Sequence, residues 1–264
     1  MRLKPYMAYA KKSFLSRSAY RFDHLMGILN TILQVFIFWE IYKALYGSRT
    51  EVDGITMTMV TTNFVLSLCL NAVFCVNDFF IPGRIWAGNI ANELLLPISL
   101  QGRMVAENVG NALFKLIFHF VPALLISIFV VGLAAPKNIT MFILFLISAL
   151  LGYGVLWTLS FATQMLAFWL INIWSIVTIK NVFVNVLSGS MIPLWFMPDW
   201  MSGIITYTPF ASIYFTPVQI YLGQLSYEEI LWKYVIQLMW IGIVYAIGNF
   251  LWIKGQKKLV VQGG

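Results

Sequence analysis

The stretch Asn138–Ile179 reads NITMFILFLISALLGYGVLWTLSFATQMLAFWLINIWSIVTI and contains no charged residue. A helix rises about 1.5 Å per residue and a bilayer core is about 30 Å thick, so this run is too long for a single crossing. It predicts a helical hairpin with its turn near Ala167–Asn172 and with spans at Thr140–Leu166 and Ile173–Ser190. Two such apolar helices in succession are typical of an integral membrane protein.

The composition of the whole chain agrees with this interpretation. Of the 264 residues, 60% are hydrophobic and only 10% are charged, whereas soluble domains carry about 25% charged residues. A soluble fold of this length could not hide so much apolar surface, because much of a globule's surface stays in water. The composition therefore excludes a soluble enzyme, a nucleic-acid-binding domain, a disordered chain and a disulfide scaffold.

Charged residues mark the ends of four further apolar segments, so we expect an all-α integral membrane fold with six transmembrane helices. The additional predicted spans are Leu25–Tyr46, Gly54–Val76, Asn108–Gly132 and Ile230–Ile253. Residues 1–264 are expected to form a single transmembrane domain, divided into a cytoplasmic interfacial helix in 1–24, spans one to five in 25–190, an outer re-entrant segment in 191–229, and span six with a cytoplasmic tail in 230–264.

Lysines and arginines are distributed unequally between the predicted loops. They concentrate in the N-terminal tail, in the loop after the second span and in the C-terminal tail, whereas the opposite loops hold only Arg49 and Lys137. Because cytoplasmic loops are enriched in Lys and Arg, both termini are predicted to be cytoplasmic. This topology accounts for the net charge of +7, so no nucleic-acid partner is expected.

The N-terminal tail has the pattern of a helix that lies in the membrane interface. In Lys4–Leu15, apolar side chains fall on one helical side, with Lys11 and Lys12 on the other. The apolar side is formed by Tyr6, Met7, Ala10 and Phe14. A basic tail that only sets the topology is the alternative interpretation.

Residues 191–229 are apolar but do not have the pattern of an ordinary span. Prolines at the density found here interrupt a long helix, so we expect short helical pieces that dip into the outer leaflet. The prolines are Pro193, Pro198, Pro209 and Pro217. Irregular backbone at that depth must be covered by protein or line a wet cavity.

Polar residues repeat on one face of the second and fifth predicted spans. Polar groups inside a membrane are costly, so they indicate either a functional path between helices or hydrogen bonds that hold the bundle together, and both interpretations stay open. The stripe residues are Asn63, Ser67 and Asn71 on span two, and Thr178, Asn181, Asn185 and Ser188 on span five. Lys180 lies beside the second stripe and has no obvious acidic partner in its own span.

The longest predicted cytoplasmic loop, Asn77–Glu107, contains a candidate amphipathic helix. Pro82 and Pro97 punctuate the helix-forming stretch Ile85–Leu96. Such a helix either rests on lipid headgroups or docks in the groove of a soluble partner. The chain contains no phosphate-loop motif for ATP and no His or Cys set with metal-ligand spacing, so we expect no catalytic residue, no metal and no cofactor on this chain.

These segments resemble, in order, those of the membrane subunit of ABC exporters of the ABC-2 type, especially the small bacterial permeases with one six-span subunit per chain. The loop from Gly83-Arg84 to Glu93-Leu94-Leu95-Leu96-Pro97 is similar to the family's R-x-G-x-I…E-L-L-x-P segment, with Gly88 and Ile90 in the Gly and Ile places. The stretch Leu187–Trp200 is similar to the family's S-G-x-x-I-P-L-x-x-F-P-x-W. Phe196-Met197-Pro198 stands where Phe-Pro is usual, which inserts a residue or shifts the register.

The resemblance implies a membrane unit of two subunits, as a homodimer or a pair with a related permease, with a separate ATPase subunit docked on each. ATP and Mg would be bound by those partners, while this chain contacts the lipid bilayer. The residues that couple to the ATPase would be Arg84, Gly88, Ile90, Glu93, Leu94, Leu95 and Pro97. The outer hairpin would include Gly189, Pro193, Phe196, Pro198, Trp200, Pro209 and Pro217, and the two polar stripes would line the translocation path.

The function implied by the resemblance is export of an amphiphilic drug, peptide or lipid-like substrate across the bacterial cytoplasmic membrane. A transporter or channel that works without ATP, or a membrane anchor for another complex, is the alternative. Ion-coupled carriers usually contain internal repeats or interrupted helices around their midplane site. The sequence has no evident repeat, and acidic residues are nearly absent from the centres of its predicted spans.

Overall fold

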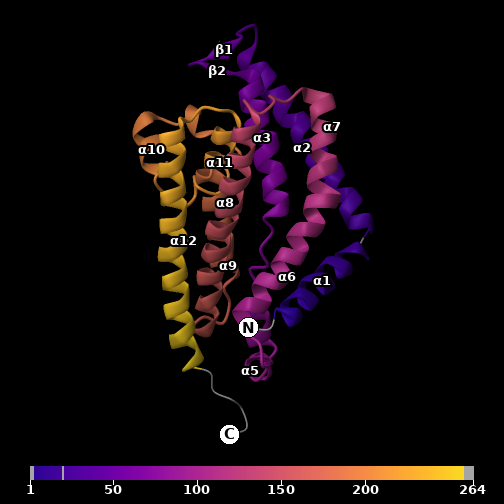
Figure 1. Ribbon diagram of the computed structural model, residues 1–264, viewed down its shortest axis with the longest axis vertical. Coiled ribbons are helices and arrows are strands. Elements are labelled where there is room, and N and C mark those ends of the chain that lie inside the picture. Colours follow the sequence, from indigo (N-terminus) through magenta and orange to yellow (C-terminus); the bar gives the residue numbers. More distant parts are fainter. Residues whose placement is uncertain (1–2, 20, 259–264) are drawn as a thin grey trace.

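The part of the chain that the computed structural model describes, residues 3–19 and 21–258, forms an elongated bundle whose longer helices run mostly along its long axis (Figure 1). The helices are α1 (Lys4–Ser18), α2 (Arg21–Tyr46), α3 (Met57–Val73), α4 (Phe80–Trp86), α5 (Ile90–Leu94), α6 (Leu100–Lys115), α7 (Val121–Val131), α8 (Ile139–Met165), α9 (Trp174–Leu187), α10 (Asp199–Ile205), α11 (Phe215–Tyr221) and α12 (Tyr227–Gln256). Two short strands, β1 (Glu51–Val52) and β2 (Ile55–Thr56), pair antiparallel between α2 and α3.

Within the described residues, four helices are long and apolar enough to cross a bilayer, so the chain is an all-α, multi-pass membrane protein. They cover Phe22–Tyr46, Leu100–Val131, Ile139–Phe168 and Tyr227–Gln256. α3 and α9 lie at the second and fifth predicted spans but have only 17 and 14 residues. Crossing by α3 and α9, and with it the count of six spans, stays a prediction.

α8 and α9 are joined by a turn at the place that the uncharged stretch predicts. α8 ends at Met165, a 3-10 turn follows at Leu166–Phe168, and α9 begins at Trp174. α8 is the most buried of the four long helices. In its most apolar stretch of 18 residues, 39% is buried, against 17–22% in the corresponding stretches of the others. α12 packs along α8, which places α8 at the centre of this half of the bundle.

The second of the four long helices, at the third predicted span, extends further than the sequence predicts. It is unbroken from Leu100 to Val131, whereas the charges predict a span at Asn108–Gly132. A π-helical turn, Leu116–Phe120, lies directly before the turn that contains Pro122. Proline has no N–H and its ring clashes with the carbonyl four residues earlier, and a π turn is a common way for a helix to absorb such a conflict.

α1 packs along α6, and this contact covers much of the side that was expected to face lipid. Phe14 lies edge-on against Phe114, with ring centroids 5.4 Å apart. A side chain at Gly110 would collide with the backbone carbonyl of Ala10, so glycine is what allows the two helices to approach. Met7 alone of the four predicted apolar residues is fully exposed, because an apolar helix face can be covered by a second helix as well as by lipid.

The predicted single helix Ile85–Leu96 is wrong. α4 and α5 are separate helices, and the chain turns between them at Gly88, which has φ +70°. This left-handed conformation favours glycine, since other residues meet a clash of their Cβ there. Pro82 lies inside the first turn of α4 rather than before a helix, a position that proline tolerates because first-turn N–H groups have no helical partner.

Figure 1 shows the two ends of the bundle. α5, the first turn of α1 and the last turn of α12 lie at one end, called here the α5 end, and β1, β2 and α10 lie at the other, the α10 end. Residues 191–229 contain short helical pieces, as predicted: a 3-10 turn at Leu194–Phe196, then α10 and α11. α11 packs against α3 and α8, so this segment turns back into the bundle.

Candidate functional site

Ion pairs join α4, α5 and α6 at the α5 end. The Arg84 guanidinium lies 3.3 Å from the Glu93 carboxylate and stacks over the Phe80 ring. Glu93 also pairs with Arg103, whose Nε lies 3.0 Å from Glu107 one turn along α6. The four charged side chains are 15–27% exposed, so their pairing is only partly screened by water and fixes α5 against α6.

Arg84 and Glu93 are among the predicted coupling residues, whereas Arg103 and Glu107 are not. The i, i+4 spacing of the missed pair is an available signal, because such residues face each other on a helix. That signal does not say which other segment the pair meets, since the contact with Glu93 depends on the turn at Gly88.

The coupling segment, residues 80–97, is anchored to the helices next to it. Ile81 and Ile90 are buried in a cluster that includes Phe161 of α8 and Trp252 of α12. The Ile81 N–H donates to Gln164 Oε1 of α8 at 3.1 Å. A displacement of α4 and α5 therefore acts directly on α8 and α12.

Several apolar side chains of the coupling segment nevertheless face outward. Leu95 is 83% exposed, and Trp86 and Leu96 are also exposed. The other predicted coupling residues differ in exposure: Gly88 and Pro97 are exposed, Leu94 is half-buried, and Ile90 is buried. An apolar surface is thus presented at the α5 end on a segment that internal ion pairs hold in place.

Most residues of the two predicted polar stripes lie in two different environments, one buried and one at a cavity. Asn63, Ser67 and Ser188 are completely buried, and Asn63 Nδ2 donates to the Gly189 carbonyl at 3.1 Å. The hydroxyls of Ser67 and Ser188 have no hydrogen-bond partner among the described residues. These three stripe residues are therefore sealed inside the protein.

Three of the four remaining stripe residues meet a polar cavity of about 330 Å³ between α3, α6, α8 and α9. Asn71, Asn181 and Asn185 line it, and Asn71 Nδ2 donates to the Tyr214 hydroxyl at 3.1 Å. Thr178 is exposed and outside this lining, and its hydroxyl donates to a carbonyl one turn back in α9. Three of the seven stripe residues therefore come together at one cavity.

Lys180 has an acidic partner outside its own helix. Its Nζ lies 2.6 Å from Asp78 Oδ1 and 2.9 Å from Ser160 Oγ, and the two charged side chains are 9% and 12% exposed. All three residues border the polar cavity, together with Lys115 of α6. The sequence alone does not reveal the pair, because its members are 102 residues apart.

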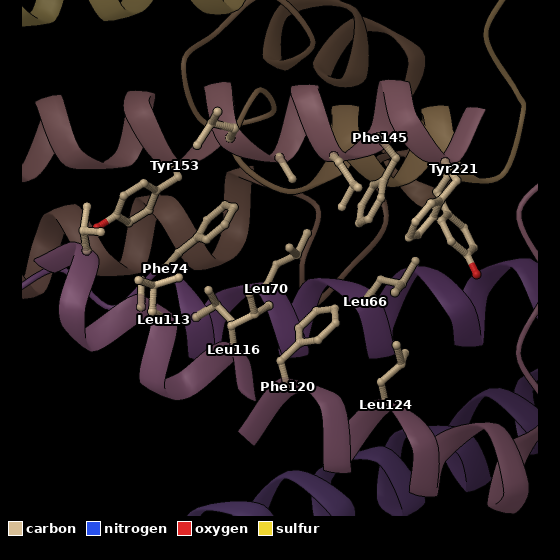
Figure 2. A pocket seen from close by; sticks show the side chains of 17 residues that line it. Leu66, Leu70, Phe74, Leu113, Leu116, Phe120, Leu124, Phe145, Tyr153 and Tyr221 are labelled. Atoms are coloured by element: carbon tan, nitrogen blue, oxygen red, sulfur yellow. The ribbon is translucent and has the colours of Figure 1, made fainter. Parts of the chain in front are cut away.

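A second cavity, of about 370 Å³, is lined by apolar side chains from α3, α6, α7 and α8 (Figure 2). Figure 2 shows Phe74 and Tyr153 at one end of it and Phe145 and Tyr221 at the other. Phe74 also borders the polar cavity. The sequence gives no sign of this second cavity, since all of its lining residues except Tyr221 fit ordinary apolar spans.

The predicted outer-hairpin residues lie mainly at turns and helix starts. Gly189 has φ +71° and its backbone lies against the Phe215 ring, so a side chain there would be both strained and crowded. The prolines occupy places that suit a fixed φ: Pro193 and Pro198 directly precede the 3-10 turn and α10, Pro209 lies between α10 and α11, and Pro217 lies in the first turn of α11. Phe196 and Trp200 are exposed.

Neutral contacts hold residues 191–229 against the bundle. Gln237 Nε2 of α12 donates to the Ser212 carbonyl at 2.8 Å, and a Cβ at Gly152 of α8 would collide with that same carbonyl. The Tyr221 hydroxyl donates to the Ala134 carbonyl at 3.1 Å. Burial raises the pKa of this phenol, so it stays a neutral donor.

Titratable side chains do not gather into a metal centre in the described part of the chain. Within residues 3–19 and 21–258, no three His, Cys, Asp or Glu side chains come close enough together to hold a metal ion. Cys69 is buried and Cys75 is half-buried, and both are free thiols.

Nearly the whole chain matches a known protein family. A family model described as "ABC-2 family transporter protein" matches residues 28–263, while no curated protein matches. Proteins of this family are membrane transport components, generally non-catalytic, that normally work with an ABC ATPase. The chain, with its four long apolar helices, therefore belongs to the ABC-2 family of membrane transporters and is a transport permease.

Proposed function

We propose that this chain is the membrane-spanning subunit of an ATP-driven exporter and that a separate ABC ATPase supplies the hydrolysis, with ATP and Mg bound there. Family membership supports the proposal. The structural observation that carries it is the exposed apolar surface of Leu95, Leu96 and Trp86 on a segment fixed by ion pairs. An apolar surface on a short segment held in place by ion pairs suits docking in a groove of a soluble partner.

Closure of the ATPase subunits on ATP would displace the coupling segment. Ile81 and Ile90 are packed against α8 and α12, so that displacement would move these two helices as rigid bodies. α1 lies along α6 at the same end and would offer a second contact. Residues 191–229, which turn back against α8, would then shift with α8 and open the outer face.

In this proposal, the α5 end faces the cytoplasm of a bacterium, both termini lie on that side, and α3 and α9 complete six spans. The first turn of α1 and the last turn of α12 lie at the same end (Figure 1). The excess of Lys and Arg in the corresponding segments supports the cytoplasmic assignment. Residues 191–229 would cap the exit at the outer membrane face.

Two permease subunits, either identical or related, would enclose the path, each docked on one ATPase subunit. α9 supports this arrangement, because Val177 and Val184 are its only buried residues while Thr178 and Asn181 are exposed. An exposed polar helix face at membrane depth requires a polar neighbour. The second subunit and the water between the two would provide it, and an amphiphile would be the transported substrate.

The coupling role is tested by Leu95→Asp in the complete complex, reconstituted in nanodiscs with its ATPase. A carboxylate pressed into an apolar groove loses its hydration, so we expect ATPase association and substrate-stimulated turnover to fall by about tenfold or more. The permease itself should insert normally, because Leu95 is exposed in the described structure. Co-purification and ATP turnover are the two readouts.

Ile204→Asp is the matched control, since Ile204 is 64% exposed on α10 at the opposite end. It should leave ATPase association unchanged. Equal losses in both variants would reveal a general insertion defect, and unchanged turnover in Leu95→Asp would refute the docking role. Transport by the chain reconstituted without any ATPase would refute the ATP-driven mechanism as a whole.

A further inference from the structure

The polar cavity has an excess of positive charge. Lys115 and Lys180 border it, and Asp78 is the one acidic residue among its described lining residues. Asp78 is already paired with Lys180 at 2.6 Å. Lys115 has no ion pair within the described part of the chain, so one lysine that no carboxylate neutralises borders the cavity.

Neutral hydrogen-bonding groups surround this charge. Asn181 and Asn185 line the cavity from α9, and their amides can donate to the oxygens of an anion. A phosphate or carboxylate partner would form a charge-assisted hydrogen bond with the ammonium group of Lys115. The cavity therefore has the chemistry of a site for a single anionic group.

The apolar cavity adjoins the polar one across an aromatic wall. Phe74 lines both cavities, and its ring centroid lies 5.4 Å from that of Tyr153 on the apolar side and 5.6 Å from that of Tyr214 on the polar side. Figure 2 shows Phe74 and Tyr153 together at one end of the apolar cavity. The two cavities thus meet at Phe74.

The cavities also follow a definite direction along the bundle. The apolar cavity extends along α3 from Phe74 back to Leu66, which is about 12 Å toward the α10 end. The polar cavity continues from Asn71 to Asp78, toward the α5 end. A lipid of the inner leaflet has the same direction, with its headgroup toward the cytoplasm and its chain toward the midplane.

We infer that the two cavities together bind one molecule, an amphiphile with a singly charged anionic headgroup. Its phosphate or carboxylate contacts Lys115 and Lys180, and its hydrocarbon chain fills the apolar cavity beyond Phe74. The inference rests on the proposed function, to which it adds the charge of the substrate and the leaflet from which it enters. The side of entry lies between α6 and α8, where exposed Leu113 and Leu150 border the apolar cavity.

The test compares two probes with the same acyl chain, oleoyl lysophosphatidylglycerol, which is anionic, and oleoyl lysophosphatidylcholine, which is zwitterionic. Binding to the full-length permease in nanodiscs is measured by native mass spectrometry, without ATPase. We expect about tenfold tighter binding of the anionic probe, because both probes carry a phosphate but the choline of the zwitterionic one brings a second cation close to Lys115 and Lys180. Equal binding of the two probes by the unmodified chain would overturn the inference.

Two variants separate the headgroup site from the chain site. Lys115→Gln should reduce the preference for the anionic probe to about twofold or less, while Lys115→Arg retains it. Ala112→Phe fills the apolar cavity that Ala112 lines. It should weaken the binding of both probes equally and leave the preference for the anionic probe unchanged. Lys43→Gln is the control, since Lys43 lies outside both cavities and is 57% exposed.

The outcomes distinguish this inference from the proposed function. A preference that persists in Lys115→Gln, or that Lys43→Gln reduces equally, would overturn the assignment of the headgroup site. Neither result would affect ATPase association, which Leu95→Asp measures independently. Unchanged ATPase association and turnover in Leu95→Asp, together with an intact anionic preference, would instead overturn the proposed function and leave the binding site standing.

Discussion

The two ends of the molecule are held together by different interactions. At the α5 end, charges join α4, α5 and α6, with Glu93 between Arg84 and Arg103. At the α10 end, neutral contacts hold residues 191–229, among them the hydrogen bond from Gln237 and the backbone contact at Gly152. Ion pairs can exchange partners and are weakened by salt, whereas a close-packed backbone contact has no room to adjust.

Both ends contact α8. Through Gln164 it receives the hydrogen bond from the coupling segment, and through Gly152 it contacts the outer segment. The charged end can rearrange against its neighbours, while the outer segment must follow α8. In the proposed mechanism, motion that enters at the α5 end would reach residues 191–229 through α8.

The largest effect is expected from breaking the buried charge pair near the α5 end. Lys180→Met leaves the Asp78 carboxylate buried without its partner, and we expect a loss of about 3–5 kcal/mol in stability. The double variant Lys180→Met with Asp78→Asn removes both charges and should recover most of that loss. Thermal unfolding in nanodiscs measures both, and equal losses in the single and double variants would contradict a coupled pair.

A smaller effect is expected from adding one methyl group where the outer segment meets α8. Gly152→Ala should cost about 1–3 kcal/mol, because the new Cβ meets the backbone of Ser212 and Ile213. Gly242→Ala is the matched control in α12, where a Cβ would meet nothing within 4 Å. It should be neutral or stabilising by up to about 1 kcal/mol, and similar losses in the two variants would refute the close contact.

The smallest effect is expected in the ion-pair network itself. Arg103→Gln should lower the free energy of local opening of α5 by about 1 kcal/mol, since only part of the network's charge is withdrawn from water. Hydrogen exchange of the amides of α5 and α10 measures this. High salt should reproduce the change at α5, and a change of equal size at α10 would remove the distinction between the two ends.

Much of the architecture could be predicted from the absence of charges. The uncharged stretch from Asn138 to Ile179 forces a hairpin, and the prolines after Gly189 force short helices, because both follow from local chemistry. The break between α4 and α5 is harder to predict from the sequence. Gly88 is its physical reason, but a glycine only permits a positive φ and does not require it.

Contacts between distant segments could not be predicted in this way. Asn63, Ser67 and Asn71 share a helix face, yet two are sealed and one borders a cavity, because burial depends on which helix lies opposite. The partner of Lys180 is set by how α3 ends beside α9. Gly110 of α6 weakly indicates the docking of α1 on α6. The periodicity of α1 alone does not indicate it.

The length of α9 has a consequence for the surrounding bilayer. Its 14 residues extend about 21 Å, well short of a hydrocarbon core of about 30 Å. Lipids beside a short span compress to match it. In the proposed six-span arrangement, a molecule leaving the polar cavity next to α9 would face a thinner insulating layer than one flipping through undisturbed membrane, and the short helix would lower the barrier to passage.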